Sequence, residues 1–178
     1  KTAAFGFPIL EKITHNHGLQ ALILVPTREL CEQVTTEMRK FAKYKRMDII
    51  AVYGGVSINP QMHNLRHADI VVGTPGRILD HLQRGTLNLQ KVKVLVLDEA
   101  DKMFEMGFID DIKKIISQGP RERQTLLFSA TISSQVHDIV KQYMKQPEKI
   151  KVQSYVEEGK LDQFYYNVPS REKYSILV

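Results

Sequence analysis

Cysteine is nearly absent from this sequence, and so are the long apolar runs that membrane proteins carry. The single cysteine, Cys31, excludes an internal disulfide framework and indicates a reducing compartment. No apolar run approaches membrane-spanning length, and no signal peptide is visible. We therefore expect an intracellular protein, cytoplasmic or nuclear, that has no membrane partner and is a monomer.

The sequence also lacks an initiating methionine and opens at Lys1-Thr2, so we expect a piece of a longer protein. Its 178 residues, of which 43% are hydrophobic, suffice for one ordinary domain with a core and for a remnant of another. A formal charge of +5, from 25 basic and 20 acidic residues, favours a polyanionic partner without requiring one.

Short apolar runs alternate with amphipathic segments along most of the chain. The alternation predicts an α/β fold with a mostly parallel sheet covered by helices on both faces. Strands are expected at residues 21–25, 48–53, 69–73, 92–97, 124–128, 149–152 and 164–168. Helices are expected at residues 2–14, 27–44, 60–67, 75–83, 109–117 and 133–144, although Gly6 and Pro8 weaken the first.

Apolar periodicity stops at residues 154–163, which predicts a linker. We expect residues 1–153 to form the first domain and residues 164–178 to begin a second one, with Ser170 capping its helix. The aromatic residues after the linker could be a stacking patch for nucleic acid. Membership in the core of the second domain is favoured, because Tyr174 has no continuing helix to complete its apolar face.

Three carboxylates, Asp98, Glu99 and Asp101, follow the apolar run at residues 92–97. Carboxylates at the exit of a buried strand are costly to desolvate without a cation or hydrogen-bond donors nearby. They also lie where open α/β sheets bind ligands, beyond the carboxyl ends of the strands. A hydrated Mg²⁺ that carries nucleotide phosphates suits such a cluster. An acidic N-cap of the next helix is the alternative, and the residues alone leave both open.

Four more unusual segments begin where predicted strands end: PTREL at 26–30, GG at 54–55, TPGR at 74–77 and SAT at 129–131. Thr27 suits a helix N-cap, and a helix that starts at Pro75 exposes amide groups that bind phosphate. The two glycines allow close approach of a ligand but also make an ordinary turn. Because the strands are parallel, all these segments should converge on one edge of the sheet.

Two further features have plainer interpretations. His15 and His17 could suggest a metal, but no Cys or His partners follow at ligand spacing, so a solvated loop is favoured. The basic residues that close the second helix are most simply a solvated face; they are Arg39, Lys40, Lys43, Lys45 and Arg46.

These motifs, in this order, resemble those of the DEAD-box ATP-dependent RNA helicases of helicase superfamily 2. The matching segments are Lys1-Thr2 as the end of a phosphate-binding loop, PTREL, GG, TPGR, DEAD at 98–101, Met-Gly-Phe at 106–108 and SAT. The resemblance covers almost the whole chain. It implies the first of two RecA-like domains, lacking its phosphate-loop strand, and the beginning of the second.

The resemblance implies ATP and Mg²⁺ as cofactors. Lys1 would contact the β- and γ-phosphates, and Thr2 and Asp98 would ligate Mg²⁺. Glu99 would orient and deprotonate the attacking water. These roles agree with phosphoryl transfer, which needs a cation to neutralise developing charge and an oriented water.

The resemblance also implies that Asp101 links to Ser129 and Thr131 and so joins the nucleotide state to the position of the second RecA-like domain. RNA would be the polyanionic partner, held by its backbone without reading of sequence. The implied RNA-binding residues are Pro26, Thr27, Arg28, Gly54, Gly55, Thr74, Pro75, Gly76 and Arg77.

The function that follows is an RNA-dependent ATPase that unwinds short RNA duplexes or remodels ribonucleoprotein. A catalytically incompetent RNA- or protein-binding module and a DNA-directed motor of the same superfamily are alternatives. A metabolic nucleotide-binding enzyme is the weakest interpretation, because the dinucleotide glycine fingerprint is absent. The resemblance implies glycines before Lys1 that cradle phosphate, and arginines in the second domain that complete the ATP site. Both are missing from this sequence, so we expect residues 1–178 alone to show negligible ATPase activity. RNA-stimulated ATP turnover by this piece would overturn that expectation.

Overall fold

The computed structural model describes residues 1–151, 164–169 and 172–176. The chain divides into two compact units, Lys1–Pro147 and Glu148–Val178. The strands of the first unit are β1 (Ala21–Leu24), β2 (Ile49–Val52), β3 (Ile70–Gly73), β4 (Val94–Leu97) and β5 (Gln124–Leu127). Its helices are α1 (Thr2–Lys12), α2 (Arg28–Phe41), α3 (Ile58–Leu65), α4 (Pro75–Gln83), α5 (Ala100–Glu105), α6 (Ile109–Gln118) and α7 (Ser134–Tyr143).

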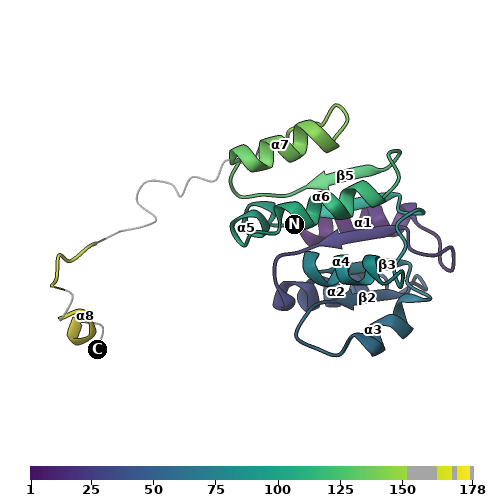
Figure 1. Cartoon of the computed structure of the whole chain (residues 1–178), viewed down its shortest axis with the longest axis horizontal. Helices are drawn as coiled ribbons and strands as arrows, with labels where there is room; N and C mark the ends of the chain where they lie inside the picture. Colours follow the sequence, from purple (N-terminus) through teal and green to yellow (C-terminus); the bar gives the residue numbers. More distant parts are fainter. Residues whose placement is uncertain (152–163, 170–171, 177–178) are drawn as a thin grey trace. The chain divides into compact units, whose positions relative to one another are not determined.

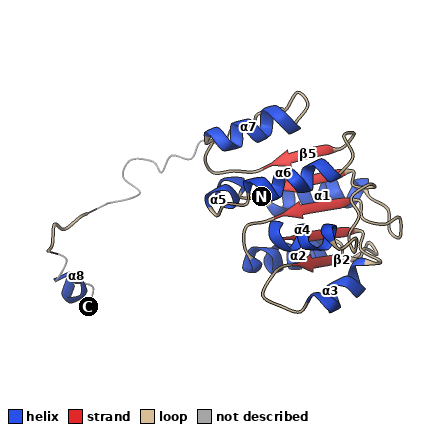
Figure 2. Cartoon of the chain, in the orientation of Figure 1, coloured by secondary structure: helices blue, strands red, loops and turns tan. Residues whose placement is uncertain are grey.

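The five strands form one sheet in the order β2-β3-β1-β4-β5, and every neighbouring pair is parallel. The central strands β1, β3 and β4 are buried along their whole length, whereas the edge strand β5 is partly exposed. Figure 2 shows these strands side by side with helices on both sides of them. The predicted parallel sheet with helices on both faces is confirmed.

Alternate residues of each strand point into two separate cores, as the period of a strand requires. Leu22 and Leu24 of β1 belong to the core that α4, α5, α6 and α7 cover, while Ala21 and Ile23 belong to the core under α1 and α2. Figure 1 shows α4 and α6 on one side of the sheet and α1 and α2 on the other. Burial on both faces explains why β1 has an uninterrupted apolar sequence.

The connections that leave β1 and β4 go to opposite faces of the sheet. Strand β1 leads into α2, which packs in one core, and β4 leads into α5 and α6, which pack in the other. Because β1 and β4 are neighbours, their carboxyl ends flank a topological switch point, where open α/β sheets bind ligands.

Helix α1 forms despite the two residues that argued against it. Gly6 lies against α2, and a Cβ there would come within 2.9 Å of Met38 Sδ and 3.0 Å of the Phe41 ring. The glycine therefore permits close approach of the two helices. Phe5 and Ile9 are buried in the same interface, and their packing outweighs the hydrogen bond that Pro8 cannot donate.

Two predicted strands in the second unit are wrong for the residues that the structure describes. Residues 149–151 and 164–169 have no regular structure, because no neighbouring strand in the described chain supplies the hydrogen bonds of a ladder. Ile150 is accordingly 89% exposed. Only the short helix α8 (Lys173–Ile176) is regular there. The predicted linker at 154–163 and the predicted cap Ser170 lie outside the described residues.

Among the helices that the structure describes, none is long and apolar enough to cross a lipid bilayer.

The basic end of α2 is only partly the solvated face that was expected. Arg39 donates two hydrogen bonds to the Ile49 carbonyl, at 3.2 and 2.8 Å, and so ties α2 to β2. Lys45 donates to the carbonyl oxygens of Leu10 and Ile13 and thereby caps the end of α1.

Candidate functional site

Lys1, Asp98 and Glu99 meet at the carboxyl end of β4. Lys1 Nζ lies 3.5 Å from Asp98 Oδ1 and 3.7 Å from Glu99 Oε1. The Asp98 side chain is only 3% exposed, whereas Lys1 is 54% exposed and Glu99 is 29% exposed. The switch point is thus lined by a buried carboxylate, Asp98, a partly exposed carboxylate, Glu99, and an exposed ammonium group, Lys1.

The backbone bends sharply where these carboxylates lie. Glu99 adopts a left-handed conformation with φ 51°, which non-glycine residues rarely adopt. Asp98 Oδ1 accepts a hydrogen bond of 3.0 Å from the Glu99 N–H and stabilises this bend. Glu99 occupies the N-cap position of α5, but its side chain caps nothing and lies 3.4 Å from Lys102 Nζ. Strained backbone of this kind gathers at functional sites. The alternative that Glu99 is only an acidic N-cap accounts for its place at the start of α5, but its side chain makes no capping hydrogen bond.

The same residues fit a hard divalent cation. Asp98 and Glu99 supply carboxylate oxygens, and Thr2, half-buried at the start of α1, supplies a hydroxyl oxygen. An all-oxygen set with one or two carboxylates is what Mg²⁺ takes when it also carries phosphate. Among the described residues, no hydrogen bond joins Thr2 to Asp98.

Asp101, Ser129 and Thr131 form a second group, which joins α5 to the segment after β5. Asp101 Oδ2 accepts hydrogen bonds from the N–H of Ala130 at 3.1 Å, from the N–H of Thr131 at 2.9 Å and from the Thr131 hydroxyl at 3.0 Å. The Ser129 hydroxyl donates to the Thr131 carbonyl at 2.6 Å. Asp101 of the DEAD segment therefore contacts Ala130 and Thr131 of the SAT segment directly, and Ser129 contacts Thr131.

These contacts change the acidity of Asp101. Burial raises its pKa, but the hydrogen bonds from Thr131 and from the Lys102 N–H outweigh burial and leave the pKa below its ordinary value. The carboxylate is therefore firmly ionised near neutral pH.

The PTREL segment meets the residue that precedes the glycine pair. Arg28 lies over the Tyr53 ring, 4.9 Å from its centroid, and 3.5 Å from Glu32. The Tyr53 hydroxyl donates to Glu32 at 2.5 Å, and this hydrogen bond lowers the pKa of Glu32 and raises that of Tyr53. Arg28 is thus held by one face of an aromatic ring while its outer side stays exposed.

The TPGR segment meets the residue that follows the glycine pair. Both terminal nitrogens of Arg77 donate to the Val56 carbonyl at 3.1 Å. The Arg77 side chain is only 15% exposed, so much of it faces the protein. At the carboxyl edge of β1, β2 and β3, the PTREL segment therefore contacts the residue before the glycine pair, and the TPGR segment contacts the residue after it.

The remaining predicted RNA-binding residues build the turns of this edge. Thr27 caps α2 by accepting a hydrogen bond of 3.2 Å from the Leu30 N–H, and Pro26 before it is buried. Thr74 is the N-cap residue of α4 without a side-chain cap, Pro75 is buried at the first turn, and Gly76 is half-buried. In the described chain no hydrogen bond or ion pair joins these turns to Lys1, Asp98 or Glu99.

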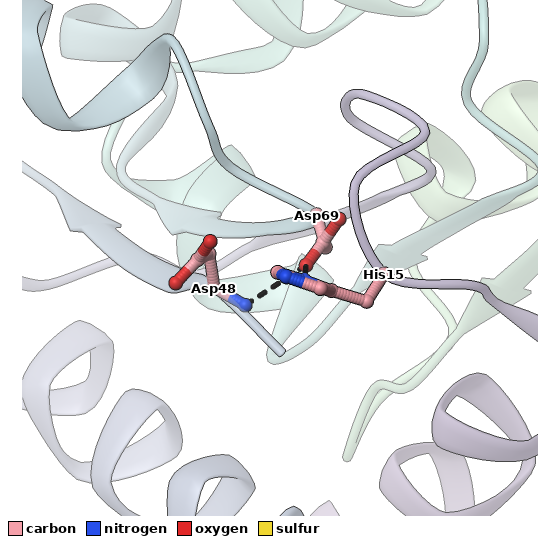
Figure 3. Close-up of side chains that lie close together, drawn as sticks. All are labelled: His15, Asp48 and Asp69. Carbon is pink, nitrogen blue, oxygen red and sulfur yellow. Dashed lines mark hydrogen bonds and ion pairs between the residues drawn. The ribbon is translucent and has the colours of Figure 1, made fainter. Parts of the chain in front are cut away.

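A further cluster lies at the opposite, amino edge of the sheet. The buried Asp69 accepts hydrogen bonds from His15 Nδ1 at 2.7 Å, from the Asn16 N–H at 2.8 Å and from the Asp48 N–H at 2.9 Å. Figure 3 shows His15 and the Asp48 backbone nitrogen directed at Asp69. The expectation that residues 15–18 are a solvated loop is therefore wrong for His15. With three donors on Asp69, the cluster ties the loop after α1 to the amino ends of β2 and β3.

Comparison with known proteins defines the class. A family model described as DEAD/DEAH box helicase matches residues 1–139, and the chain belongs to that family. Among curated relatives, the chain is similar to DEAD-box ATP-dependent RNA helicase CshA of Bacillus cereus, with 48% identity over 99% of the chain and 34% of the relative. It is also similar to the CshA helicase of Bacillus subtilis, with 45% identity over 99% of the chain and 36% of the relative.

Solved structures of DEAD-box proteins have the same fold. A DEAD box protein from the hyperthermophile Methanococcus jannaschii has a TM-score of 0.84 and 44% identity, covering 99% of this chain and 48% of that one. The yeast DEAD-box splicing factor Prp28 has a TM-score of 0.76 and 36% identity, covering 81% of this chain and 37% of that one. The fold is therefore RecA-like, as the resemblance implied. The chain spans about a third of the length of the curated relatives.

Several residues that shape this edge were not predicted from the sequence. Tyr53 and Glu32 hold Arg28. Gln61 contacts Arg77 directly, and His81 contacts Gln61. Tyr53 could have been noticed because it ends a strand directly before the glycine pair. Gln61 and His81 carry no such signal, since each is one of several polar residues in its helix.

Proposed function

We propose that the complete protein is an ATP-dependent RNA helicase, an RNA-stimulated ATP hydrolase that unwinds short duplexes or remodels ribonucleoprotein. The observation that carries the proposal is the placement of Lys1 Nζ within 3.5 Å of Asp98 and 3.7 Å of Glu99 at the switch point. The same edge of the sheet carries Arg28 and Arg77 on either side of the glycine pair. The names of the curated relatives, which are RNA helicases, support the same activity.

In this proposal Lys1 contacts the β- and γ-phosphates of ATP, and Thr2 and Asp98 hold Mg²⁺. When bound, Mg²⁺ neutralises charge that develops on the transferred phosphoryl group. Glu99 orients the attacking water and accepts its proton. Its partial exposure supports this role, because a base must reach the water that it activates.

Asp101, Ser129 and Thr131 would connect the nucleotide to the position of a second RecA-like domain in the same chain. Their contacts support this role because they tie α5, which follows Glu99 directly, to the segment after the last strand. Residues 164–178 would belong to that second domain, and residues 154–163 would link the two.

RNA would be bound through its backbone at the turns after β1, β2 and β3. The Gly54 and Gly55 N–H groups, which make no hydrogen bond in the described chain, and the start of α4 would donate to phosphates. Pro26, Thr27, Thr74, Pro75 and Gly76 would shape these turns. Such binding reads no bases, as an unwinding enzyme requires. We propose a monomer that acts inside the cell, in cytoplasm or nucleus.

The proposal is tested by ATP hydrolysis of the complete protein with single-stranded RNA or with DNA of the same sequence. Stimulation by RNA of several sequences alike, and not by DNA, is the expected result. RNA binding without any ATP turnover would favour a binding module instead. Equal or greater stimulation by DNA would favour a DNA-directed motor.

A further inference from the structure

The turn at residues 54–56 has no packing of its own. Gly55 adopts φ +79°, and beyond the adjoining residues of the chain no atom lies within 4 Å of the position that a Cβ would occupy on either Gly54 or Gly55. The two N–H groups make no hydrogen bond in the part of the chain that the structure describes. The shape of this turn must therefore come from residues that hold its ends.

Two side chains hold the carbonyl groups on either side of the glycine pair. Gln61 Nε2 donates to the Tyr53 carbonyl at 3.0 Å, and both terminal nitrogens of Arg77 donate to the Val56 carbonyl at 3.1 Å. Fixing the two flanking carbonyls restricts the peptide planes between them. The orientation of the Gly54 and Gly55 N–H groups thus depends on Gln61 and Arg77.

Gln61 is oriented by its own partners. Its Oε1 accepts from Arg77 Nη1 at 3.3 Å and from His81 Nε2 at 3.1 Å. Arginine only donates and a carbonyl only accepts, so just one orientation of the carboxamide satisfies Arg77 and Tyr53 together. Gln61 is 7% exposed, which leaves it unable to contact RNA itself.

His81 contacts Gln61 on the side away from the glycine turn. It is fully buried, and its Nδ1 lies 2.8 Å from the Thr86 hydroxyl. Because Gln61 Oε1 only accepts, Nε2 carries the hydrogen in this contact. The Thr86 hydroxyl also donates to the His81 carbonyl at 3.1 Å and so holds the ring from its other side. A run of hydrogen bonds therefore reaches from the end of α4 to the exposed glycine turn.

We propose that Gln61 and His81 are positioning residues for RNA binding, which hold the glycine turn and Arg77 in the conformation that grips the RNA backbone. The inference rests on the proposed function, since it requires that the turn binds RNA. Its physical basis is preorganisation, because a turn that is already in its bound conformation loses less entropy when it binds.

The test uses the complete protein and measures the RNA concentration that gives half-maximal stimulation of ATP hydrolysis, together with KM for ATP. Gln61→Met removes all three hydrogen bonds with little change in volume. We expect it to raise the RNA half-saturation roughly ten-fold and to leave KM for ATP within about two-fold of wild type. His81→Leu should raise it roughly five-fold, and His81→Gln, which keeps a donor near the Nε2 position, should restore it.

Gln20→Met is the matched control. Gln20 is also a buried glutamine with several hydrogen bonds, to Thr14, Gly18 and Lys93, but it lies at the amino edge of the sheet. It should destabilise the fold in the same way and leave the RNA half-saturation unchanged.

Equal RNA half-saturation in wild type, Gln61→Met and His81→Leu would overturn the inference while the proposed function stands. A matching rise in Gln20→Met would also overturn it, since the effect would then be general destabilisation. A wild-type protein that RNA does not stimulate would instead overturn the proposed function, and the inference with it.

Discussion

Asp101 accepts both the backbone N–H and the hydroxyl of Thr131, at 2.9 and 3.0 Å, and so joins the first turn of α5 to the segment after β5. These two residues are 30 positions apart in the sequence and belong to two different motifs. One carboxylate oxygen thus connects the acidic rim of β4 to the chain that leaves the sheet. The strength of this connection depends on the negative charge of the Asp101 carboxylate.

The first prediction concerns the Asp101→Asn variant and its pH dependence. The folded pKa of Asp101 is lowered, so the unfolded chain binds its proton first as pH falls. Its stabilisation is therefore complete above the ordinary value of 3.8 and is lost as pH falls through the lower folded value. Urea unfolding at pH 7 should show Asp101→Asn less stable by about 1 kcal/mol, after allowance for solvent screening.

The same difference should begin to shrink as pH falls below 3.8, and it should approach zero only below the folded pKa of Asp101. A difference that stays constant from pH 7 to pH 3 would show that the charge of Asp101 is not what stabilises the contact with Thr131.

A second prediction concerns Gly73, the last residue of β3. A Cβ at this position would lie 2.5 Å from Ile78 Cδ1 and 2.8 Å from the Val52 carbonyl oxygen, which is backbone and cannot move aside. Gly73→Ala should therefore destabilise the fold by about 2–3 kcal/mol in urea unfolding. Gly54→Ala is the control, because nothing lies within 4 Å of its Cβ position. Equal stability of the two variants would contradict the close packing of α4 on β3.

A third prediction separates backbone contact from other effects of charge. If Arg28 contacts one RNA phosphate, Arg28→Ala in the complete protein should reduce the slope of log affinity against log salt by about 0.7. The loss of affinity should be the same for RNA of different sequences. Arg121→Ala removes the same charge from an exposed position before β5, at the amino edge, and should leave the slope unchanged. An unchanged slope in Arg28→Ala, or a loss confined to one sequence, would remove Arg28 from the phosphate-binding surface.

Much of the fold was predictable from the sequence because burial leaves a local signature. A strand covered on both faces must be apolar throughout, as β1 and β4 are, and parallel pairing then fixes where the motifs converge. The strands predicted at residues 149–152 and 164–168 rested on β-branched and aromatic residues alone. A strand also needs a hydrogen-bonding neighbour, which composition does not reveal.

The contacts that shape the site were less predictable. The hydrogen bond between His15 and Asp69 spans 54 positions, and that between Gln61 and His81 spans 20. Each depends on two segments that meet only after the sheet has assembled. The motifs identified Asp98, Glu99 and Arg77 as candidates, but the residues that orient Arg77 have no motif of their own.

The central claim is that Glu99 activates water at a nucleotide site formed with Lys1 and Asp98, and Glu99→Gln in the complete protein tests it most directly. The substitution keeps the size and polarity of the side chain and removes its basicity. The measurement is RNA-stimulated ATP turnover, with ATP and RNA affinities determined on the same sample. We predict that turnover falls by a factor of about 100 or more while both affinities stay within about two-fold of wild type. Turnover equal to that of the wild type would contradict the account.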